Sequence, residues 1–321
     1  MDSLSQFVLG SAVAVVVTKE PSRKVAIWGG IIATIPDLDV FIQYADPIER
    51  TTSHRGFSHS LIVLTLFAPF LGVLISKVLK TIDKQKVILM TWLALITHPL
   101  LDSLTIYGTQ LLWPIADLQS NVMIGSIFII DPLYTLWLLI ALLLILLGYK
   151  NENVRLRAAQ LGLAISTLYL SFTLYAQEGI VKPIIKDSSY DQVIITPYPF
   201  NTINWNIVKI KGDQYTESCV NIFNRLEIEK FRGFLNHDLL NSDSISRYAK
   251  FSNNFYKLDP DTFNNRLLLT DLRMGNHQQY VFNFIVGSKN SDEKNFKSTK
   301  PFRVKVGTGR TLEKISLTCK S

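Results

Sequence analysis

The run VILMTWLALITHPLLDSLTIY, residues 87–107, decides the fold that we expect for this chain. It is almost entirely apolar and matches the ~20 residues that a helix needs to cross the hydrocarbon core of a bilayer. Five other apolar runs are candidates for helices: residues 4–17, 25–35, 61–76, 124–148 and 158–175. The sequence therefore predicts an α-helical integral membrane bundle of four to six apolar helices.

The charges divide the chain into two unlike parts. Residues 1–179 carry 12 Lys/Arg and 12 Asp/Glu, so the whole net charge of +7 lies in residues 180–321. The second part holds β-branched and aromatic runs, such as residues 202–208 and 279–286, with turn residues between them. We expect a membrane-embedded helical domain over residues 1–179 and an extramembrane α+β or mainly β domain over residues 180–321.

The composition excludes several classes of protein. A chain with 48% hydrophobic residues is not intrinsically disordered, because disorder requires low hydrophobicity. Two cysteines are too few for a scaffold held together by disulfides. The pair Cys219 and Cys319 is compatible either with one disulfide or with two free thiols.

Basic residues are distributed unevenly over the loops that the apolar runs define. The loops at residues 18–24, 77–86 and 149–157 together carry ten Lys and Arg, whereas residues 36–57 carry two and residues 108–125 carry none. Loops rich in Lys and Arg stay in the cytoplasm. This rule predicts a multi-pass protein whose C-terminal domain lies outside the cytoplasm.

Ionisable side chains interrupt the apolar part at three short motifs. Ionisable residues within a membrane are energetically unfavourable, so they are functional candidates by default. The predicted orientation brings all of them to the outer side, where three separate segments could meet. The motifs are IPDLD, HRGFSHS and THPLLD, and the candidates are Asp37, Asp39, His54, His59, His98 and Asp102.

These six residues offer three imidazoles and three carboxylates. Nitrogen and oxygen ligands of this kind bind zinc, manganese or iron. We expect one to three divalent metal ions, with zinc first, that activate a water for hydrolysis. Arg55, between the two histidines of HRGFSHS, is the candidate catalytic residue that neutralises the charge developing on an anionic substrate. For any single residue a structural role, such as a helix cap at Asp37, is the alternative.

The ordered set of motifs resembles a known family. It comprises DSLSQ at residues 2–6, PDLD at 36–39, HRGFSHS at 54–60, HPLLD at 98–102, TIYG at 105–108 and WP at 113–114. It is similar to the membrane-bound metal-dependent hydrolases, also described as LexA-binding, inner membrane-associated hydrolases. That family is distantly similar to zinc-dependent phospholipase C and P1-type nucleases. The resemblance implies an all-helical hydrolase with clustered metals in the bacterial inner membrane; members often have His where this chain has Gln6.

The leading hypothesis is a membrane-bound metal-dependent hydrolase. It would act on a phosphoester or lipid-linked substrate at the outer face of the cytoplasmic membrane, with membrane lipids as partners and no nucleic acid. One alternative is a transporter or channel that uses the same Asp/His cluster. Another is a non-enzymatic membrane protein with a structural metal.

Several residues stay open at this point. Gln6 and Asp131 either join the site or serve the helices, and Asp131-Pro132 is typical of a helix start. Asp271 and Arg273, in the C-terminal part, either form an ion pair or contact the site. The role of the C-terminal domain and the oligomeric state do not follow from the sequence.

Overall fold

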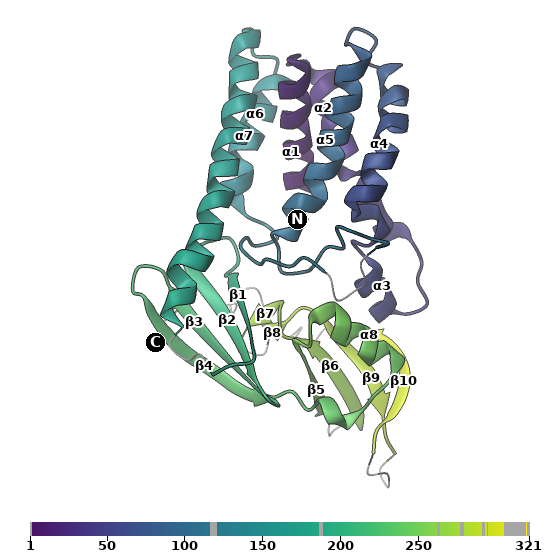
Figure 1. Cartoon of the computed structure of the whole chain (residues 1–321), viewed down its shortest axis with the longest axis vertical. Coiled ribbons are helices and arrows are strands. Elements are labelled where there is room, and N and C mark those ends of the chain that lie inside the picture. The colour runs from purple at the N-terminus through teal and green to yellow at the C-terminus, as the bar shows by residue number, and fades with distance from the viewer. Residues whose placement is uncertain are drawn as a thin grey trace.

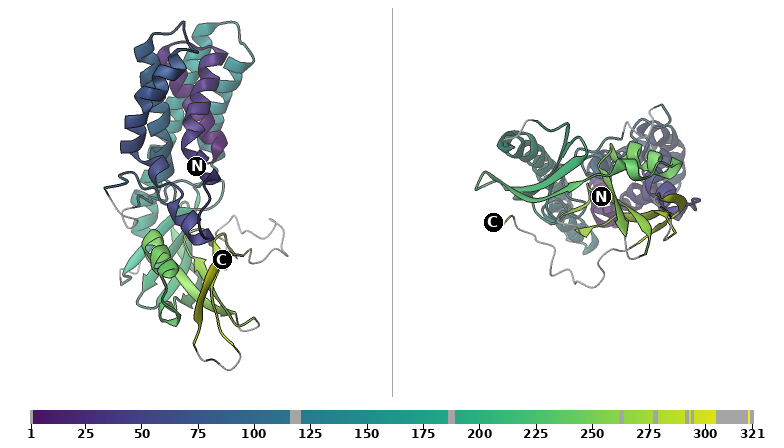
Figure 2. Two further views of the ribbon diagram at one scale, coloured as in Figure 1. Left: turned by 90° about the vertical axis from the view of Figure 1, so that its right-hand side faces the viewer. Right: turned by 90° about the horizontal axis from the view of Figure 1, so that it is seen from below.

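A bundle of helices stands on two β-sheets (Figure 1). The two further views in Figure 2 show the same division, with the sheets gathered below one end of the bundle. This computed structural model describes residues 2–115, 121–185, 189–261, 264–276, 279–290, 293, 295–304 and 319.

Among these residues, six helices run side by side in the bundle (Figure 1). They are α1 (Ser3–Thr18), α2 (Arg23–Thr34), α4 (Leu61–Ser76), α5 (Lys84–Ser103), α6 (Pro132–Leu146) and α7 (Glu152–Tyr175). Each begins after a residue whose side-chain oxygen accepts a backbone N–H of the first turn, which is the usual N-cap. The caps are Asp2, Ser22, Ser60, Asp83, Asp131 and Asn151.

Short elements connect the bundle to the rest of the chain. Between α2 and α4 lie η1 (Ile35–Phe41), α3 (Pro47–Ser53) and η2 (Phe57–His59). Helix α7 continues through η4 (Ala176–Val181) and η5 (Lys182–Ile184) and leads into the sheets. All these connections except the continuation of α7 fold over the end of the bundle that faces the sheets (Figure 1).

Helices α1 and α2 pack closely because glycines face each other. A Cβ atom on Gly10 would lie 2.3 Å from the Cβ of Ala33 and 2.5 Å from the carbonyl oxygen of Gly29. Only glycine permits that approach. The start of η1, which follows α2, lies against α5.

The C-terminal part is built from two antiparallel sheets. The first has the order β1-β2-β3-β4 and the second the order β10-β9-β6-β5, and β7 and β8 form a short ribbon. The elements are β1 (Gln192–Pro197), β2 (Asn204–Lys211), β3 (Gln214–Asn221), β4 (Leu226–Phe234), η6 (His237–Leu239), α8 (Asp243–Ser252), β5 (Tyr256–Asp261), β6 (Arg266–Asp271), β7 (Gly275–Asn276), β8 (Gln279–Tyr280), β9 (Asn283–Ser288) and β10 (Lys297–Arg303).

A disulfide and an apolar core stabilise this part. Cys219 of β3 is bonded to Cys319, which resolves the choice between a disulfide and free thiols. Helix α8 packs Tyr248 and Phe251 against Phe284 of the second sheet, in one buried cluster. Arg247 of α8 donates hydrogen bonds to Thr52 and Ser53 at the end of α3, which joins the sheets to the bundle.

The expected α-helical integral membrane bundle of four to six apolar helices is wrong, because few of the described helices are long and apolar enough to cross a membrane. Within the described part of the chain, one helix, Glu152–Ile184, is long and apolar enough to cross a membrane. A second candidate is the pair Pro47–His59 and Leu61–Ser76, which is bent by 53° at the break between them. The fold is α+β, with helices α1 to α8 and two four-stranded antiparallel sheets.

The physical reason is that several of the apolar helices are short. The run at residues 124–148 is interrupted because Asp131 caps α6 at Pro132, which leaves a helix of 15 residues. Helix α4 has 16 residues. At 1.5 Å per residue these helices reach ~22–24 Å, short of the ~30 Å hydrocarbon core.

Candidate metal centre

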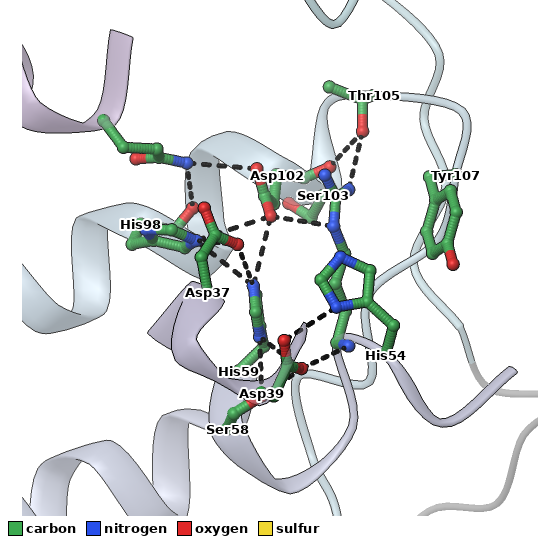
Figure 3. A network of polar contacts seen from close by, with 12 residues as sticks. Asp37, Asp39, His54, Ser58, His59, His98, Asp102, Ser103, Thr105 and Tyr107 are labelled. Carbon is green, nitrogen blue, oxygen red and sulfur yellow. Dashed lines mark hydrogen bonds and ion pairs between the residues drawn. The ribbon is translucent and has the colours of Figure 1, made fainter. Parts of the chain in front are cut away.

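The residues singled out in the sequence lie where η1, α5 and η2 meet, at the end of the bundle that faces the sheets. Figure 3 shows their polar contacts from close by. Asp37 and Asp39 lie on η1, which begins where Pro36 follows α2. His98 and Asp102 lie one turn apart on α5, so their side chains share a face. His59 ends the single turn η2.

Four ligand atoms converge in this group. The Nε2 atoms of His59 and His98 are 3.1 Å apart. Asp37 Oδ1 lies 3.5 Å from the former and 3.3 Å from the latter. Asp102 Oδ2 lies 3.3 Å and 3.6 Å from the same two nitrogens. We call these four residues the Asp/His group; all four atoms lie within 4.8 Å of one another.

The hydrogen bonds around the two rings determine which nitrogens face the centre. His98 Nδ1 lies 2.6 Å from the carbonyl oxygen of Ala33, which can only accept, so this nitrogen donates. Ser58 donates its hydroxyl proton to Asp39, so its oxygen accepts from His59 Nδ1 at 2.9 Å. In the neutral rings both Nε2 lone pairs therefore point into the centre, beside two carboxylate oxygens.

This donor set fits a divalent cation. Lone pairs and negative charges repel each other at these distances unless a positive charge lies among them. A tetrahedral ion with ligand bonds of ~2.0–2.1 Å has ligand–ligand edges of ~3.3–3.4 Å. Five of the six edges among the four atoms, from 3.1 to 3.6 Å, scatter around that length. The Asp/His group could therefore hold a metal ion.

The electrostatics of the group favour positive charge. Burial raises the pKa of Asp37, but its contacts with His59 and His98 outweigh burial and hold the pKa well below the usual range of a carboxyl. Burial lowers the pKa of His98, but its contacts with Asp102 and Asp37 outweigh burial and raise the pKa. A proton is thus drawn to the position that a metal ion would take, and metals compete with protons for such ligands.

The other two predicted ligands, Asp39 and His54, lie beside the group and pair with each other. His54 Nδ1 is 2.8 Å from Asp39 Oδ1. Asp39 Oδ2 accepts hydrogen bonds from Ser58 and from the backbone of Arg55. Burial raises the pKa of Asp39, but the partnership with His54 outweighs it and lowers the pKa. Asp39 thus orients the loop that carries His59.

Arg55 is buried and contacts a ligand carboxylate. Its Nε lies 2.9 Å from Asp102 Oδ2, and its Nη1 donates to Thr105 Oγ1. Its guanidinium group also lies over the ring of Tyr107, 4.9 Å from the centroid. The backbone of Arg55 is left-handed, with φ of 65°, a conformation that costs a side-chain-bearing residue ~1–2 kcal/mol.

Gln6 and Asp131, whose roles the sequence left open, have different roles in the structure. Gln6 contacts the group through its amide nitrogen, which donates to Asp102 Oδ1 and to the carbonyl of His98. Gln6 therefore orients a ligand carboxylate. Asp131 caps α6 and accepts a hydrogen bond from Tyr169, so it serves the helices.

A cavity of about 1040 Å³ lies next to the Asp/His group. Residues of η1, α3 and the loops before α6 line one side, and residues of the sheets line the other. We call it the junction cavity. Asp39, His54 and Arg55 line it together with Arg273 and with two residues that the sequence did not point to as part of the site, Tyr107 and Arg303. Both alternatives left open for Arg273 hold, because it pairs with Asp271 at 2.7 Å and also lines the cavity.

The bundle and the site define a protein with apolar helices and a carboxylate–histidine group that could hold a metal ion. Residues 1–180 match the model of the YdjM inner membrane protein family, so the chain belongs to that family. The match names the inner membrane and no reaction. The chain is also similar to the uncharacterized protein YfhP of Bacillus subtilis, with 23% identity over 306 residues, covering 89% of this chain and 90% of YfhP. No solved structure matches.

Proposed function

We propose that this chain is a metal-dependent hydrolase that acts on a phosphoester or lipid-linked substrate. The observation that carries the proposal is the position of the Asp/His group beside the junction cavity. Asp39, His54 and Arg55 contact the group or its loop and also line the cavity. A substrate in the cavity would therefore meet the edge of the site.

His59, His98, Asp37 and Asp102 would hold the ion, with zinc proposed first and manganese or iron as alternatives. When bound, a divalent ion supplies a Lewis acid that lowers the pKa of water. Arg55 and Gln6 hold Asp102 from two sides, and Ser58 holds His59, so the ligands are oriented before an ion binds.

We assign a separate role to His54. Asp39 binds its Nδ1, which directs its Nε2 away from that carboxylate, and His54 lines the junction cavity. An aspartate that holds the Nδ1 proton of a histidine leaves Nε2 to take or give a proton. His54 would thus move a proton at Nε2, while Arg55 keeps Asp102 in place and adds positive charge at the cavity wall.

A second candidate function is a structural metal. Four protein ligands complete a tetrahedron, and closed sites of this kind stabilise folds, whereas catalytic sites keep one position open. The favouring observation is that five of the six distances among the four ligand atoms lie near the edge length of a tetrahedral site.

We also propose how the chain lies in the inner membrane. Helix Glu152–Ile184 would cross it, with the basic residues Lys150, Arg155 and Arg157 on the cytoplasmic side. The C-terminal domain would then lie outside. The disulfide between Cys219 and Cys319 supports this orientation, because disulfides persist in oxidising compartments. A phosphatase reporter fused after Ser321 should be active, and inactivity would contradict the orientation.

The function is tested by elemental analysis of the purified chain together with a panel of phosphoester and lipid substrates. We expect a stoichiometric divalent metal that His59→Ala and Asp102→Ala lose together with hydrolysis. His237→Ala is the matched control, because His237 stacks on Tyr256 in the sheets, away from the group. Full metal content in both site variants would overturn the ligand assignment. Metal without hydrolysis of any substrate would favour the structural role.

A further inference from the structure

The junction cavity is formed jointly by the bundle end and the sheets. Its volume of about 1040 Å³ lies at the upper end of the ~300–1,000 Å³ of small-molecule sites. One wall comes from η1 and the loops before α6, and the opposite wall comes from β1, β8 and β10. The sheets therefore contribute directly to whatever the cavity binds.

Most of the cavity wall is apolar. Both sides contribute large aliphatic and aromatic side chains, among them Phe41, Ile106, Ile129, Tyr198 and Phe282. Phe41 on the bundle side and Val281 on the sheet side are 79% and 57% exposed, so apolar surface continues from the cavity to the outside. A wall of this composition favours a ligand with a hydrocarbon part.

Charge in the cavity is positive and partly uncompensated. Of its four arginines, Arg55 pairs with Asp102 and Arg273 pairs with Asp271. The other two, Arg50 and Arg303, donate to the carbonyl oxygens of Val40 and Val281. Neither forms an ion pair with any residue in the described part of the chain.

The acidic residues of the cavity do not offset these two arginines. The carboxylate of Asp39 pairs with His54 and also accepts from Ser58. Asp46 caps α3 by accepting the backbone N–H groups of Ile48 and Glu49. Two guanidinium groups thus face an apolar cavity without a negative partner, and guanidinium binds phosphate-type anions through paired hydrogen bonds.

We propose that the junction cavity binds an amphiphile with a hydrocarbon part and a phosphate-type head. Arg50 and Arg303 bind the phosphate-type head, and the apolar walls of the cavity bind the hydrocarbon part. The inference rests on the proposed function and deepens it: the substrate is an amphiphilic phosphoester, and the sheet domain provides half of its binding site. The same chemistry could come from a bilayer lipid or from a free single-chain phosphate.

The test is photo-crosslinking of the full chain, purified in a neutral detergent, with a diazirine-bearing dodecylphosphonate. Its carbon–phosphorus bond makes it a probe that a phosphoester hydrolase does not cleave. We expect labelled peptides to include residues 39–45 and 279–282. The variant Arg50→Gln/Arg303→Gln should reduce this labelling about tenfold or more, since it removes two charge-assisted contacts.

Two controls make the result specific. Arg266→Gln should be labelled as strongly as the unchanged chain. Arg266 lies over the ring of Phe302, as Arg303 lies over the ring of Phe282, but it does not line the cavity. A neutral dodecyl glycoside with the same diazirine should label those peptides weakly. Equal labelling by both probes, or unchanged labelling in the double arginine variant, would overturn the proposal.

Competition experiments distinguish a bilayer lipid from a free amphiphile as the ligand. The variant His59→Ala distinguishes the proposed hydrolase function from the proposed amphiphile site. Displacement by phosphatidylglycerol vesicles indicates a bilayer lipid, displacement by lysophosphatidic acid alone indicates a free amphiphile, and displacement by neither contradicts the inference. His59→Ala should still be labelled, because its side chain does not line the cavity. If the unchanged protein is labelled but hydrolyses no substrate, the proposed function is wrong and this inference stands. If it hydrolyses short phosphoesters but is not labelled, this inference is wrong and the proposed function stands.

Discussion

The Nε2 atoms of His59 and His98 lie 3.1 Å apart and face each other, although the two residues are 39 positions apart in the chain. The Nδ1 atom of each ring has its own hydrogen-bond acceptor, Ser58 in one case and Ala33 in the other. Two ring nitrogens at this distance repel unless a proton or a metal ion lies between them. This relationship is the basis of the predictions about the site.

Ser58→Ala should weaken metal binding without removing a ligand. The variant loses the hydroxyl group that accepts from His59 and donates to Asp39, so the imidazole is no longer held in one orientation. Loss of such an outer hydrogen bond lowers metal affinity by ~10–100-fold. Competition with a chelator measures the affinity. Ser76→Ala is the matched control, because Ser76 donates to the carbonyl of Val73 at the far end of α4, away from the Asp/His group.

His54→Ala should separate metal binding from hydrolysis. The metal content should stay stoichiometric, since His54 lies outside the four-atom group, while turnover should fall by ~10²–10⁴-fold because a proton-transfer group is lost. Elemental analysis and phosphoester hydrolysis are measured on the same preparation. If the metal were lost with the activity, His54 would be a ligand instead.

Arg273→Ala should destabilise the chain strongly. Arg273 and Asp271 are both fully buried and 2.7 Å apart, and Arg273 also donates to the carbonyl of Tyr107. Removing one partner leaves a buried charge, which costs ~3–5 kcal/mol in the free energy of unfolding. Urea unfolding followed by tryptophan fluorescence measures the loss. Arg266→Ala, at an exposed position, should change stability by less than ~0.5 kcal/mol.

Thiol titration should find no reactive thiol before reduction and two afterwards, since Cys219 and Cys319 are the chain's two cysteines and are bonded to each other. The bond closes a loop across a sequence separation of 100 residues. Cys219→Ser/Cys319→Ser should therefore lower the free energy of unfolding by ~2–4 kcal/mol. Reactive thiols in the protein purified without reductant would contradict the pairing.

The sequence pointed to the residues of the site more closely than to the architecture around them. His98 and Asp102 share a helix face by their spacing, and the Asp and His motifs stand out because charges are scarce in residues 1–179. Four of the six residues converge in the Asp/His group, while Asp39 and His54 form a pair beside it. Which of them converge depends on hydrogen bonds, such as that of Ser58, that spacing alone does not specify.

The expected membrane-spanning bundle failed for a local reason. Mean hydropathy is an average over many residues and does not reveal that Asp131 caps a helix that begins at Pro132. Because of that cap, an apolar run of 25 residues contains a helix of 15 residues. The junction cavity could not be predicted either. It needs η1 and β10 to face each other, and the two elements are more than 250 residues apart in sequence.

The family match covers one side of the junction cavity and not the other. The family match ends at residue 180, so it includes the whole Asp/His group and excludes Arg273, Arg303 and both sheets. A protein that shares only the matched region carries the four ligand atoms without the opposite wall. Exchange of the C-terminal part would then change what the cavity recognises while leaving the ligand atoms in place, which makes this chain a natural candidate for domain-swap engineering of specificity.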